Sequence, residues 1–274
     1  MNDIQKTQTN QNIIENPWAE LRKYTDARIG LGRAGVSIPT SHMLDFTLAH
    51  AKAQDAVHEP LDVQEIVTQL QGDDLAAPLL LHSQAIDRDT YLKRPDLGRR
   101  LDVLSCEKLQ EFQKHHDDSY DLSIVIADGL SSIAIKNHAA NFIKLLKSAL
   151  AKDSQDWKLA PLMIVQQGRV AIADEIGAIL GARTTLILIG ERPGLSSPDS
   201  LGLYLTWNPK VGTTDAGRNC ISNVRHEGLS YEKAVQKAMY LLKESRRLQL
   251  SGVNLKDRTF ENVLDETTHQ DKLT

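Results

Sequence analysis

Three short loops in the second half of the chain carry the residue types that could bind a ligand. They are Asp128-Gly129-Leu130-Ser131, Gln167-Gly168-Arg169-Val170 and Gly190-Glu191-Arg192-Pro193-Gly194. Each loop contains glycine, which permits a positive φ and lets the backbone approach a ligand closely. One such loop alone indicates only a tight turn from a strand to a helix. Three in succession also favour a ligand-binding crevice.

Charged residues near these loops leave two explanations open. The stretch from Lys93 to Arg100 holds three arginines and Asp96, just before a helical pattern that starts at Leu101. It is either a capped helix start or an anchor for a phosphate or carboxylate, because guanidinium groups hold such anions in bidentate fashion. Glu191 could likewise contact a ligand at a strand end, pair with Arg192, or cap the next turn.

Other motifs carry less weight. Gly30-Leu31-Gly32-Arg33-Ala34-Gly35 matches G-x-G-x-x-G, but a predicted helix precedes it, so we reject nicotinamide binding there. Gly129-Leu130-Ser131-Ser132-Ile133 starts like a nucleophile elbow but lacks the closing glycine. Consecutive residues such as His115-His116-Asp117-Asp118 cannot converge on one metal ion from a helix. Cys220 has no identifiable base partner and by default is a small apolar side chain.

The elements that must position the three loops alternate between short apolar runs and helical stretches. We expect strands at 123–127, 162–165, 185–189 and about 203–207, and helices at 133–150, 172–180 and 231–247. The strand runs are apolar on both faces, which is typical of a parallel sheet covered by helices on both sides. The sequence therefore predicts an α/β fold with a Rossmann-like, doubly wound, mostly parallel sheet. Ligands bind such sheets beyond the carboxyl ends of the strands, where the three loops lie.

The N-terminal part of the chain has a different pattern. Apolar residues at helical spacing predict helices at 17–29, 40–54 and 61–70. We expect a disordered tail at 1–16, a helical N-terminal subdomain at 17–76, a Rossmann-like domain at 77–255 and a polar C-terminal tail at 256–274.

Composition limits the possible partners and compartments. The chain has 274 residues with 32 Lys and Arg against 36 Asp and Glu, which gives no electrostatic reason for a nucleic-acid or anionic-membrane partner. Only Cys106 and Cys220 are present, which excludes a disulfide framework and fits a reducing cytoplasm. No stretch has the length of a membrane-spanning helix, and the first residues lack the pattern of a secretory signal.

Several short motifs, taken in order, resemble one known family. The chain contains Gly32-Arg33-Ala34-Gly35, Arg94-Pro95-Asp96-Leu97-Gly98-Arg99-Arg100, Asp128-Gly129-Leu130-Ser131, Gly168-Arg169-Val170, Gly190-Glu191-Arg192-Pro193-Gly194 and Cys220-Ile221-Ser222-Asn223. In this order and spacing they resemble the small (light) subunit of ethanolamine ammonia-lyase, and the likeness runs from about Pro17 to about Asn254.

The resemblance implies a lyase that uses adenosylcobalamin to convert ethanolamine to acetaldehyde and ammonia. In that family, homolysis of the cobalt–carbon bond gives an adenosyl radical, which abstracts hydrogen from the substrate before the amino group migrates and leaves. A large barrel subunit holds the substrate, and the small subunit is a Rossmann-type module that closes over the cobalamin at the subunit interface. The resemblance therefore implies a hetero-oligomer of several small and large subunits, either free in the cytoplasm or enclosed in a bacterial microcompartment.

Carried over by motif, the corrinoid contacts would be Val170, Glu191 and Cys220, and no catalytic residue or metal ligand is expected in this chain. No D-x-H-x-x-G string is present, so we expect the cofactor to keep its own dimethylbenzimidazole on cobalt, the base-on form. Two alternatives remain. One is a stand-alone nucleotide- or coenzyme-binding enzyme that uses the same crevice. The other is a scaffold whose helical N-terminal part docks the large subunit or a microcompartment shell.

Overall fold

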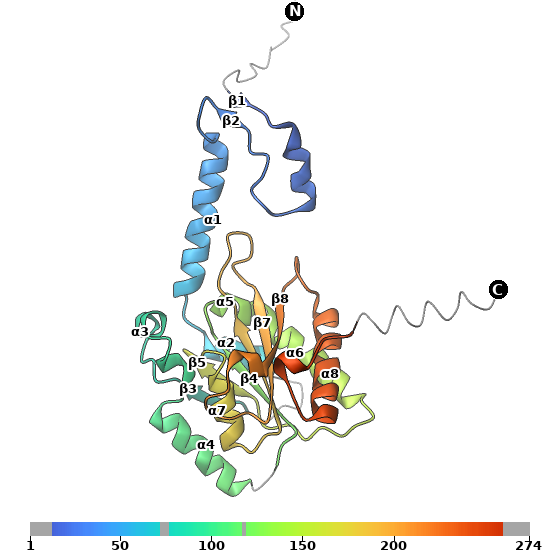
Figure 1. Cartoon of the computed structure of the whole chain (residues 1–274). Coiled ribbons are helices and arrows are strands. Elements are labelled where there is room, and N and C mark those ends of the chain that lie inside the picture. Colours follow the sequence, from blue (N-terminus) through green and yellow to red (C-terminus); the bar gives the residue numbers. More distant parts are fainter. Residues whose placement is uncertain (1–12, 72–76, 117–118, 260–274) are drawn as a thin grey trace, which may run out of the picture. The chain divides into compact units, whose positions relative to one another are not determined.

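The computed structural model describes residues 13–71, 77–116 and 119–259 (Figure 1). The chain divides into two compact units. The N-terminal unit is Met1–Asp55 with Gly194–Ser196, and the sheet unit is Ala56–Pro193 with Ser197–Thr274. The predicted boundaries at residues 16, 76 and 255 stay predictions, and most of both predicted tails, residues 1–12 and 260–274, lies outside the described residues.

The first elements of the N-terminal unit are short. Strands β1 (Ile13–Ile14) and β2 (Arg33–Ala34) pair antiparallel. Between them lies a 3-10 helix, η1 (Pro17–Tyr24), so the predicted α-helix at 17–29 is wrong in both type and length. No residue of η1 is buried. Without a packed face, little offsets the cost of nucleating an α-helix, and the segment keeps the tighter 3-10 turn.

The rest of this unit is mainly one long helix. Helix α1 (Thr40–His58) confirms the helix predicted at 40–54 and extends it by about one turn into the sheet unit. The literal G-x-G-x-x-G string overlaps β2, which pairs antiparallel and is not a parallel strand leading into a helix. This context differs from the one that dinucleotide binding requires.

The sheet unit is built on six strands in the order β3-β5-β4-β6-β7-β8. Their bounds are β3 (Leu79–His82), β4 (Leu122–Ala127), β5 (Met163–Gln166), β6 (Thr184–Gly190), β7 (Leu201–Trp207) and β8 (Arg218–Val224). The first four strands in this order are parallel, and β7 and β8 are antiparallel additions at one edge. The mostly parallel α/β sheet is therefore confirmed, while strands β3 and β8 were not predicted. The Rossmann-like classification stays a prediction.

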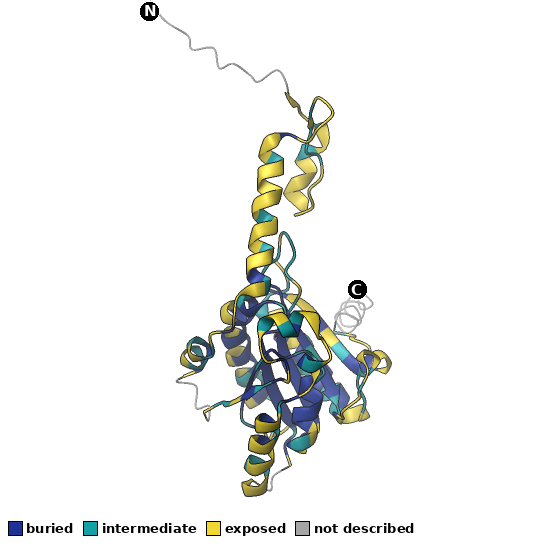
Figure 2. Cartoon of the chain, turned by 90° about the vertical axis from the view of Figure 1, so that its left-hand side faces the viewer, coloured by how far each residue is buried: buried dark blue, intermediate teal, exposed yellow. Residues whose placement is uncertain are grey.

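Helices cover both faces of the sheet. On one face the core includes residues of α2 (Val63–Leu70), α6 (Ala140–Ala151) and α8 (Tyr231–Leu248), and on the other residues of α4 (Val103–His115) and α7 (Ile172–Ile179). Along β4, Ile124 and Ile126 belong to the first core, and Val125 and Ala127 to the second. Alternate side chains point to opposite faces, which explains why the run had to be apolar throughout. Figure 2 shows these strands as the buried centre of the unit.

The helix predicted at 133–150 has an irregular start. It consists of α5 (Ser132–Ala134), a π-helical turn η3 (Ile135–Ala139) and α6. In the wide turn His138 is buried, with Nδ1 2.7 Å from the Tyr231 hydroxyl and Nε2 3.0 Å from an Asp199 carboxylate oxygen. The remaining short helices are α3 (Arg88–Lys93), η2 (Leu97–Arg99), η4 (Asp215–Gly217) and η5 (Gly252–Asn254). In the part of the chain that is described, no helix combines the length and apolarity needed to cross a membrane.

Candidate functional site

A cavity of about 990 Å³ lies in the sheet unit at the carboxyl ends of the central parallel strands. All three loops singled out in the sequence contribute to its lining, through Gly129, Leu130, Arg169, Val170, Gly190, Glu191 and Arg192. Strand β4 lies between β5 and β6, so the loops that follow these strands are neighbours. The sheet topology therefore places them at one edge, as parallel strands require.

Two glycines allow the loops after β4 and β6 to pack directly against each other. The Leu130 amide donates to the Gly190 carbonyl at 2.9 Å, and Gly129 has a φ of +58°. A Cβ on Gly190 would lie 2.0 Å from the Ser131 carbonyl oxygen, and one on Gly129 would lie 2.3 Å from the Gly190 oxygen. Backbone is thus in contact with backbone here, and no side chain fits at either position.

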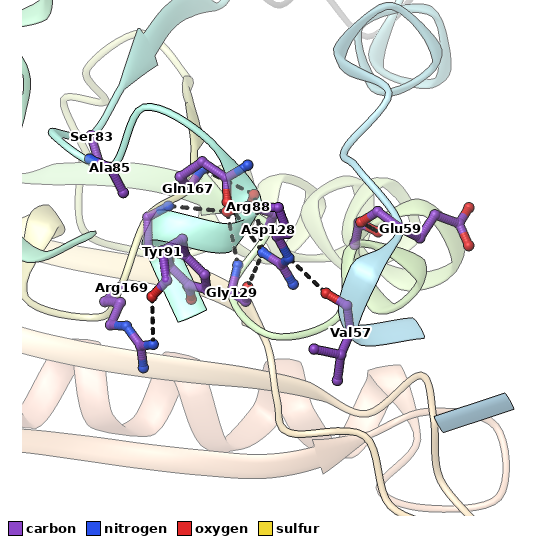
Figure 3. Close-up of polar contacts among 12 residues, drawn as sticks. Val57, Glu59, Ser83, Ala85, Arg88, Tyr91, Asp128, Gly129, Gln167 and Arg169 are labelled. Atoms are coloured by element: carbon purple, nitrogen blue, oxygen red, sulfur yellow. Dashed lines mark hydrogen bonds and ion pairs between the residues drawn. The ribbon is translucent and has the colours of Figure 1, made fainter. Parts of the chain in front are cut away.

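The Asp128 carboxylate fixes the loop after β5 from within the protein (Figure 3). It is 1% exposed and accepts hydrogen bonds from the amides of Gly129 and Gly168, both at 3.0 Å, and of Gln167 at 2.9 Å. Burial raises the pKa of Asp128 to about 6, although Arg88 and these amides act in the opposite direction. This carboxylate therefore shapes the backbone of two cavity loops.

Arg88, at the start of α3, connects the same loop to the end of α1. Its Nε donates to the Val57 carbonyl at 2.6 Å and its Nη1 to the Gly129 carbonyl at 2.8 Å, while Nη1 lies 3.6 Å from Asp128 (Figure 3). Arg88 therefore links the last turn of α1 to the loop after β4 through charge-assisted hydrogen bonds.

Tyr91 positions a second arginine at the cavity. The guanidinium carbons of Arg88 and Arg169 lie 4.8 Å and 4.5 Å from the centroid of the Tyr91 ring. The Tyr91 carbonyl accepts a hydrogen bond from Arg169 Nη2 at 3.1 Å, and burial raises the pKa of the Tyr91 hydroxyl. Arg169 Nε is buried and has no hydrogen-bond partner. This arrangement holds at the cavity lining a cation that has no acidic partner among the described residues.

Glu191 begins the loop after β6, and its carboxylate binds other parts of the chain. It accepts hydrogen bonds from the hydroxyls of Ser200 and Ser222, both at 2.5 Å, and from the Asn223 amide at 3.1 Å. It makes no ion pair with Arg192 among the described residues and caps no helix, so both of those structural alternatives are wrong. The carboxylate instead joins this loop to the start of β7 and to β8, which leaves about one of its four acceptor positions free.

Val170 and Cys220 occupy different positions relative to the cavity. Val170 lines it, whereas Cys220 lies on β8 directly opposite Tyr204, which is a lining residue of β7. Desolvation raises the pKa of the Cys220 thiol, which opposes a role as a nucleophile, and both cysteines are free. The structure thus places Val170 and Glu191 at the carboxyl ends of β5 and β6, whereas Cys220 lies level with the middle of β6 and does not line the cavity. Their contact with a corrinoid stays a prediction.

The arginine cluster before α4 divides into paired and unpaired members. Arg94 forms two hydrogen bonds with Asp96, at 3.0 and 2.7 Å, and Arg100 Nη2 lies 2.7 Å from Glu175. Arg99 lines the cavity, and no described residue pairs with its guanidinium. Asp102, and not Asp96, caps α4, since it accepts the Ser105 amide at 2.7 Å.

Sequence reasoning missed much of the opposite wall of the cavity. Tyr91, Tyr204, Arg218 and Ser222 all line it, together with the loop 211–215. Arg218 is buried and pairs with Asp174 and with Asp215. Tyr91 and Arg218 lie in α3 and β8, which were not predicted, whereas Tyr204 lies in the predicted strand near 203–207 and Ser222 in the motif Cys220-Ile221-Ser222-Asn223. Had strand β8 been predicted, Arg218 and Ser222 could have been placed near the cavity.

The residues at this edge of the sheet provide groups that can bind a ligand. Within residues 13–71, 77–116 and 119–259 no three His, Cys, Asp or Glu side chains form a group that could hold a metal ion. The two His of the 115–118 stretch are exposed on or beside α4, and Asp117 and Asp118 lie outside the described residues. The lining combines backbone donors, five arginines, four carboxylates and apolar side chains, and groups of these kinds can orient a ligand.

Known proteins resemble the chain along most of its length. The family profile "Ethanolamine ammonia-lyase light chain (EutC)" matches residues 15–256. The chain is 54% identical over 257 residues to the ethanolamine ammonia-lyase small subunit of Pseudomonas fluorescens Pf0-1, covering 94% of this chain and 93% of the relative. It is 57% identical over 254 residues to that of Pseudomonas aeruginosa LESB58, covering 92% and 91%. The chain therefore belongs to the ethanolamine ammonia-lyase light chain family.

Proposed function

We propose that this chain is the small subunit of an adenosylcobalamin-dependent ethanolamine ammonia-lyase and covers the cobalamin where the large subunit meets it. The enzyme converts ethanolamine to acetaldehyde and ammonia by radical chemistry. The observation that carries the proposal is the single cavity formed by the three glycine-containing loops, in a chain whose relatives have this name.

The lining of the cavity fits such a cofactor. Its volume is at the upper end of the roughly 300–1,000 Å³ of ordinary ligand pockets, as a large cofactor shared between two subunits requires. Leu130, Val170 and Ile189 offer apolar surface to a macrocycle, and the arginines of the lining offer donors to polar substituents. Gly129 and Gly190 let the loops after β4 and β6 pack backbone against backbone, which fixes the shape of this part of the lining.

The base-on form is supported by the composition of the same lining. Among its described residues there is no histidine, and the sequence has no D-x-H-x-x-G string. This chain therefore offers no lower axial ligand to cobalt from the cavity, and the cofactor would keep its own dimethylbenzimidazole.

Bound adenosylcobalamin supplies the radical that removes a hydrogen atom from the substrate. The residues of this chain would hold the cofactor in one orientation and exclude water. Asp128 fixes the loops after β4 and β5 through backbone amides, and Glu191 fixes the loop after β6 against β8. A rigid wall of this kind reduces the ordering cost of binding.

The large subunit is the expected partner of the N-terminal unit. Pro39 alone is buried among the described residues of this unit, while large apolar side chains are exposed. They include Trp18, Leu21, Tyr24, Ile29, Val36, Ile38, Met43, Leu44, Phe46 and Leu48. So many exposed apolar groups in one short segment are typical of a permanent interface between subunits.

Acetaldehyde release tests the proposed function. Ethanolamine and adenosylcobalamin would be added to this chain alone, to the large subunit encoded beside it, and to both co-expressed. We expect activity, co-purification and a cobalamin absorption spectrum only when both chains are present. Two chains that stay separate and give no turnover would refute the proposal and favour a stand-alone nucleotide- or coenzyme-binding enzyme.

Substitutions in the wall test the site itself. Val170→Trp should weaken cobalamin binding without unfolding the chain, because the larger ring fills the cavity. Glu191→Ala should weaken it by releasing three hydrogen bonds that hold the loop after β6. Ser200→Ala, which removes only one of the three, is the matched control and should have the smaller effect. Unchanged cobalamin affinity in Val170→Trp and Glu191→Ala would contradict the site.

A further inference from the structure

Charged groups around the cavity are not balanced. The lining contains five arginines, at 99, 100, 169, 192 and 218, and four carboxylates, at 96, 175, 191 and 215. Every one of the four carboxylates already has a partner within the protein. Asp96 binds Arg94, Glu175 binds Arg100, Asp215 binds Arg218, and Glu191 accepts hydrogen bonds from two serines and an amide. Arginines therefore neutralise three of the four carboxylates, and Glu191 has only neutral partners among the described residues.

Three arginines are left without an acidic partner in the described part of the chain. Arg99 and Arg192 are exposed and make no side-chain hydrogen bond or ion pair with a described residue. Arg169 is held against Tyr91, and its Nε is buried without any acceptor. An anionic ligand in the cavity would give these guanidinium groups the acidic partner that the described residues do not provide.

These three arginines line the same cavity from separate elements. The Arg169 amide donates to the Gly98 carbonyl at 2.7 Å, which places the start of the loop after β5 beside Arg99. Arg192 follows β6 on the same edge. The substituents of the corrin ring are mostly neutral amides, and the anionic group of cobalamin is the phosphodiester that links the ring to its benzimidazole nucleotide. Guanidinium groups that line the cavity without an acidic partner match that group and not the amides.

We infer that Arg99, Arg169 and Arg192 form an anion subsite that binds the phosphodiester of cobalamin. The inference rests on the proposed function and extends it to the part of the cofactor that this chain recognises. The subsite anchors the nucleotide tail, while the apolar loop residues contact the ring. Of the three, Arg169 is oriented in advance by Tyr91, and Arg99 and Arg192 become ordered when the anion binds.

Comparing the affinities of two corrinoids distinguishes binding at this subsite from binding in the rest of the cavity. Cobalamin carries the phosphodiester, and cobinamide keeps the corrin ring and cobalt but lacks both the phosphate and the benzimidazole. The affinity of each would be measured, by absorption titration, for the complex of this chain with the large subunit. Arg99→Ala and Arg192→Ala should each weaken cobalamin binding by about tenfold or more, since a charge-assisted hydrogen bond contributes that much. Both should leave cobinamide binding unchanged.

Arg183→Ala is the matched control, because this exposed arginine directly precedes β6 at the opposite end of the strand from Arg192. It should change neither affinity. Equal losses for both corrinoids, or no loss for cobalamin, would overturn the anion subsite alone. Failure of the unmodified complex to bind either corrinoid would instead overturn the proposed function, and this inference with it. Arg169→Ala is the least informative of the three variants, because it also removes the contacts of Arg169 with the carbonyl and the ring of Tyr91.

Discussion

Helices α1 and α8 have nearly the same length and very different surroundings. Helix α8 has 18 residues and buries six of them, at 234, 235, 238, 241, 242 and 245, in a stripe against the sheet. Helix α1 has 19 residues and buries only Ala56, in its last turn. The apolar residues of α8 recur every three or four positions, whereas Met43, Leu44, Phe46 and Leu48 of α1 spread around the helix.

The difference indicates where each helix gains its stability. Helix α8 is held by a core that this chain supplies, so the sheet unit can maintain its own fold. A helix with almost no buried face is marginal in water, because packing and not propensity provides most helical stability in proteins. The N-terminal unit is therefore expected to depend on the large subunit, and substitutions in the two units should have separable effects.

The largest contrast should come from two phenylalanines. Phe142 of α6 is fully buried, and Phe46 of α1 is 42% exposed. Phe142→Ala should reduce the free energy of unfolding by about 3–5 kcal/mol through lost burial and a cavity. Phe46→Ala should change it by less than about 0.5 kcal/mol. Urea unfolding followed by tryptophan fluorescence measures both, and similar losses in the two variants would show that the N-terminal unit has a core of its own.

Substituting one glycine in each unit should give a smaller difference in stability between the two units. Gly190→Ala would place a Cβ 2.0 Å from a backbone oxygen of the loop after β4, so the two loops must separate. We expect a loss of about 3 kcal/mol in stability, together with weaker cobalamin binding. Gly35→Ala in the N-terminal unit meets no atom within 4 Å and has only the strain of a φ of +62°, roughly 1–2 kcal/mol. Equal thermal shifts for the two variants would contradict the close packing of the loops.

Much of this contrast could be predicted from the sequence, because it depends on local patterns. The buried parallel strands β4, β5 and β6 read as continuous apolar runs, and each ends at a glycine-containing turn. Once these strands were recognised, the position of the three loops followed from topology alone. The helix predicted at 40–54 followed from apolar residues at helical spacing, although such spacing does not show whether this chain supplies a core for the helix to pack against.

The parts that could not be predicted depend on distant contacts. In β8 the buried residues are Arg218, Ile221 and Val224, and the pairing with β7 shifts register between Leu201 and Leu203. An edge strand with a bulge loses the period-two alternation that identifies a strand. The contacts of Glu191 and Tyr91 could not be predicted for the same reason. Glu191 binds Ser222 and Asn223 of β8, and Tyr91 lies in α3, and neither element was predicted.

The buried carboxylate of the sheet unit should make its stability depend on pH. The pKa of Asp128 is raised from 3.8 to about 6 in the folded chain, so this group contributes stability that is fully present below pH 3.8 and is lost as the pH rises through 6. Between about pH 4.5 and 7.5 the loss amounts to about 2 kcal/mol.

Asp128→Asn would remove this titration, although it should also weaken the loops at every pH because the amide nitrogen faces backbone donors. The stability of the unmodified chain should therefore fall relative to the variant over this pH range. Asp55→Asn, at an exposed position of the N-terminal unit for which the described residues provide no ion pair, is the control and should leave the pH dependence unchanged. A constant difference between the Asp128 variant and the unmodified chain across the range would refute the assignment.

The smallest expected effect on the fold, and the most direct test of the comparison, concerns two exposed leucines. Leu44 of α1 is 63% exposed and Leu104 of α4 is 74% exposed, so replacing either with serine should hardly change the stability of the isolated chain. If the large subunit covers the N-terminal unit, Leu44→Ser should weaken binding to that subunit by about tenfold, whereas Leu104→Ser should not. Co-purification and titration with the labelled large subunit would measure this. The reverse result would place the interface on α4, and the exposed apolar residues of α1 would then need another partner.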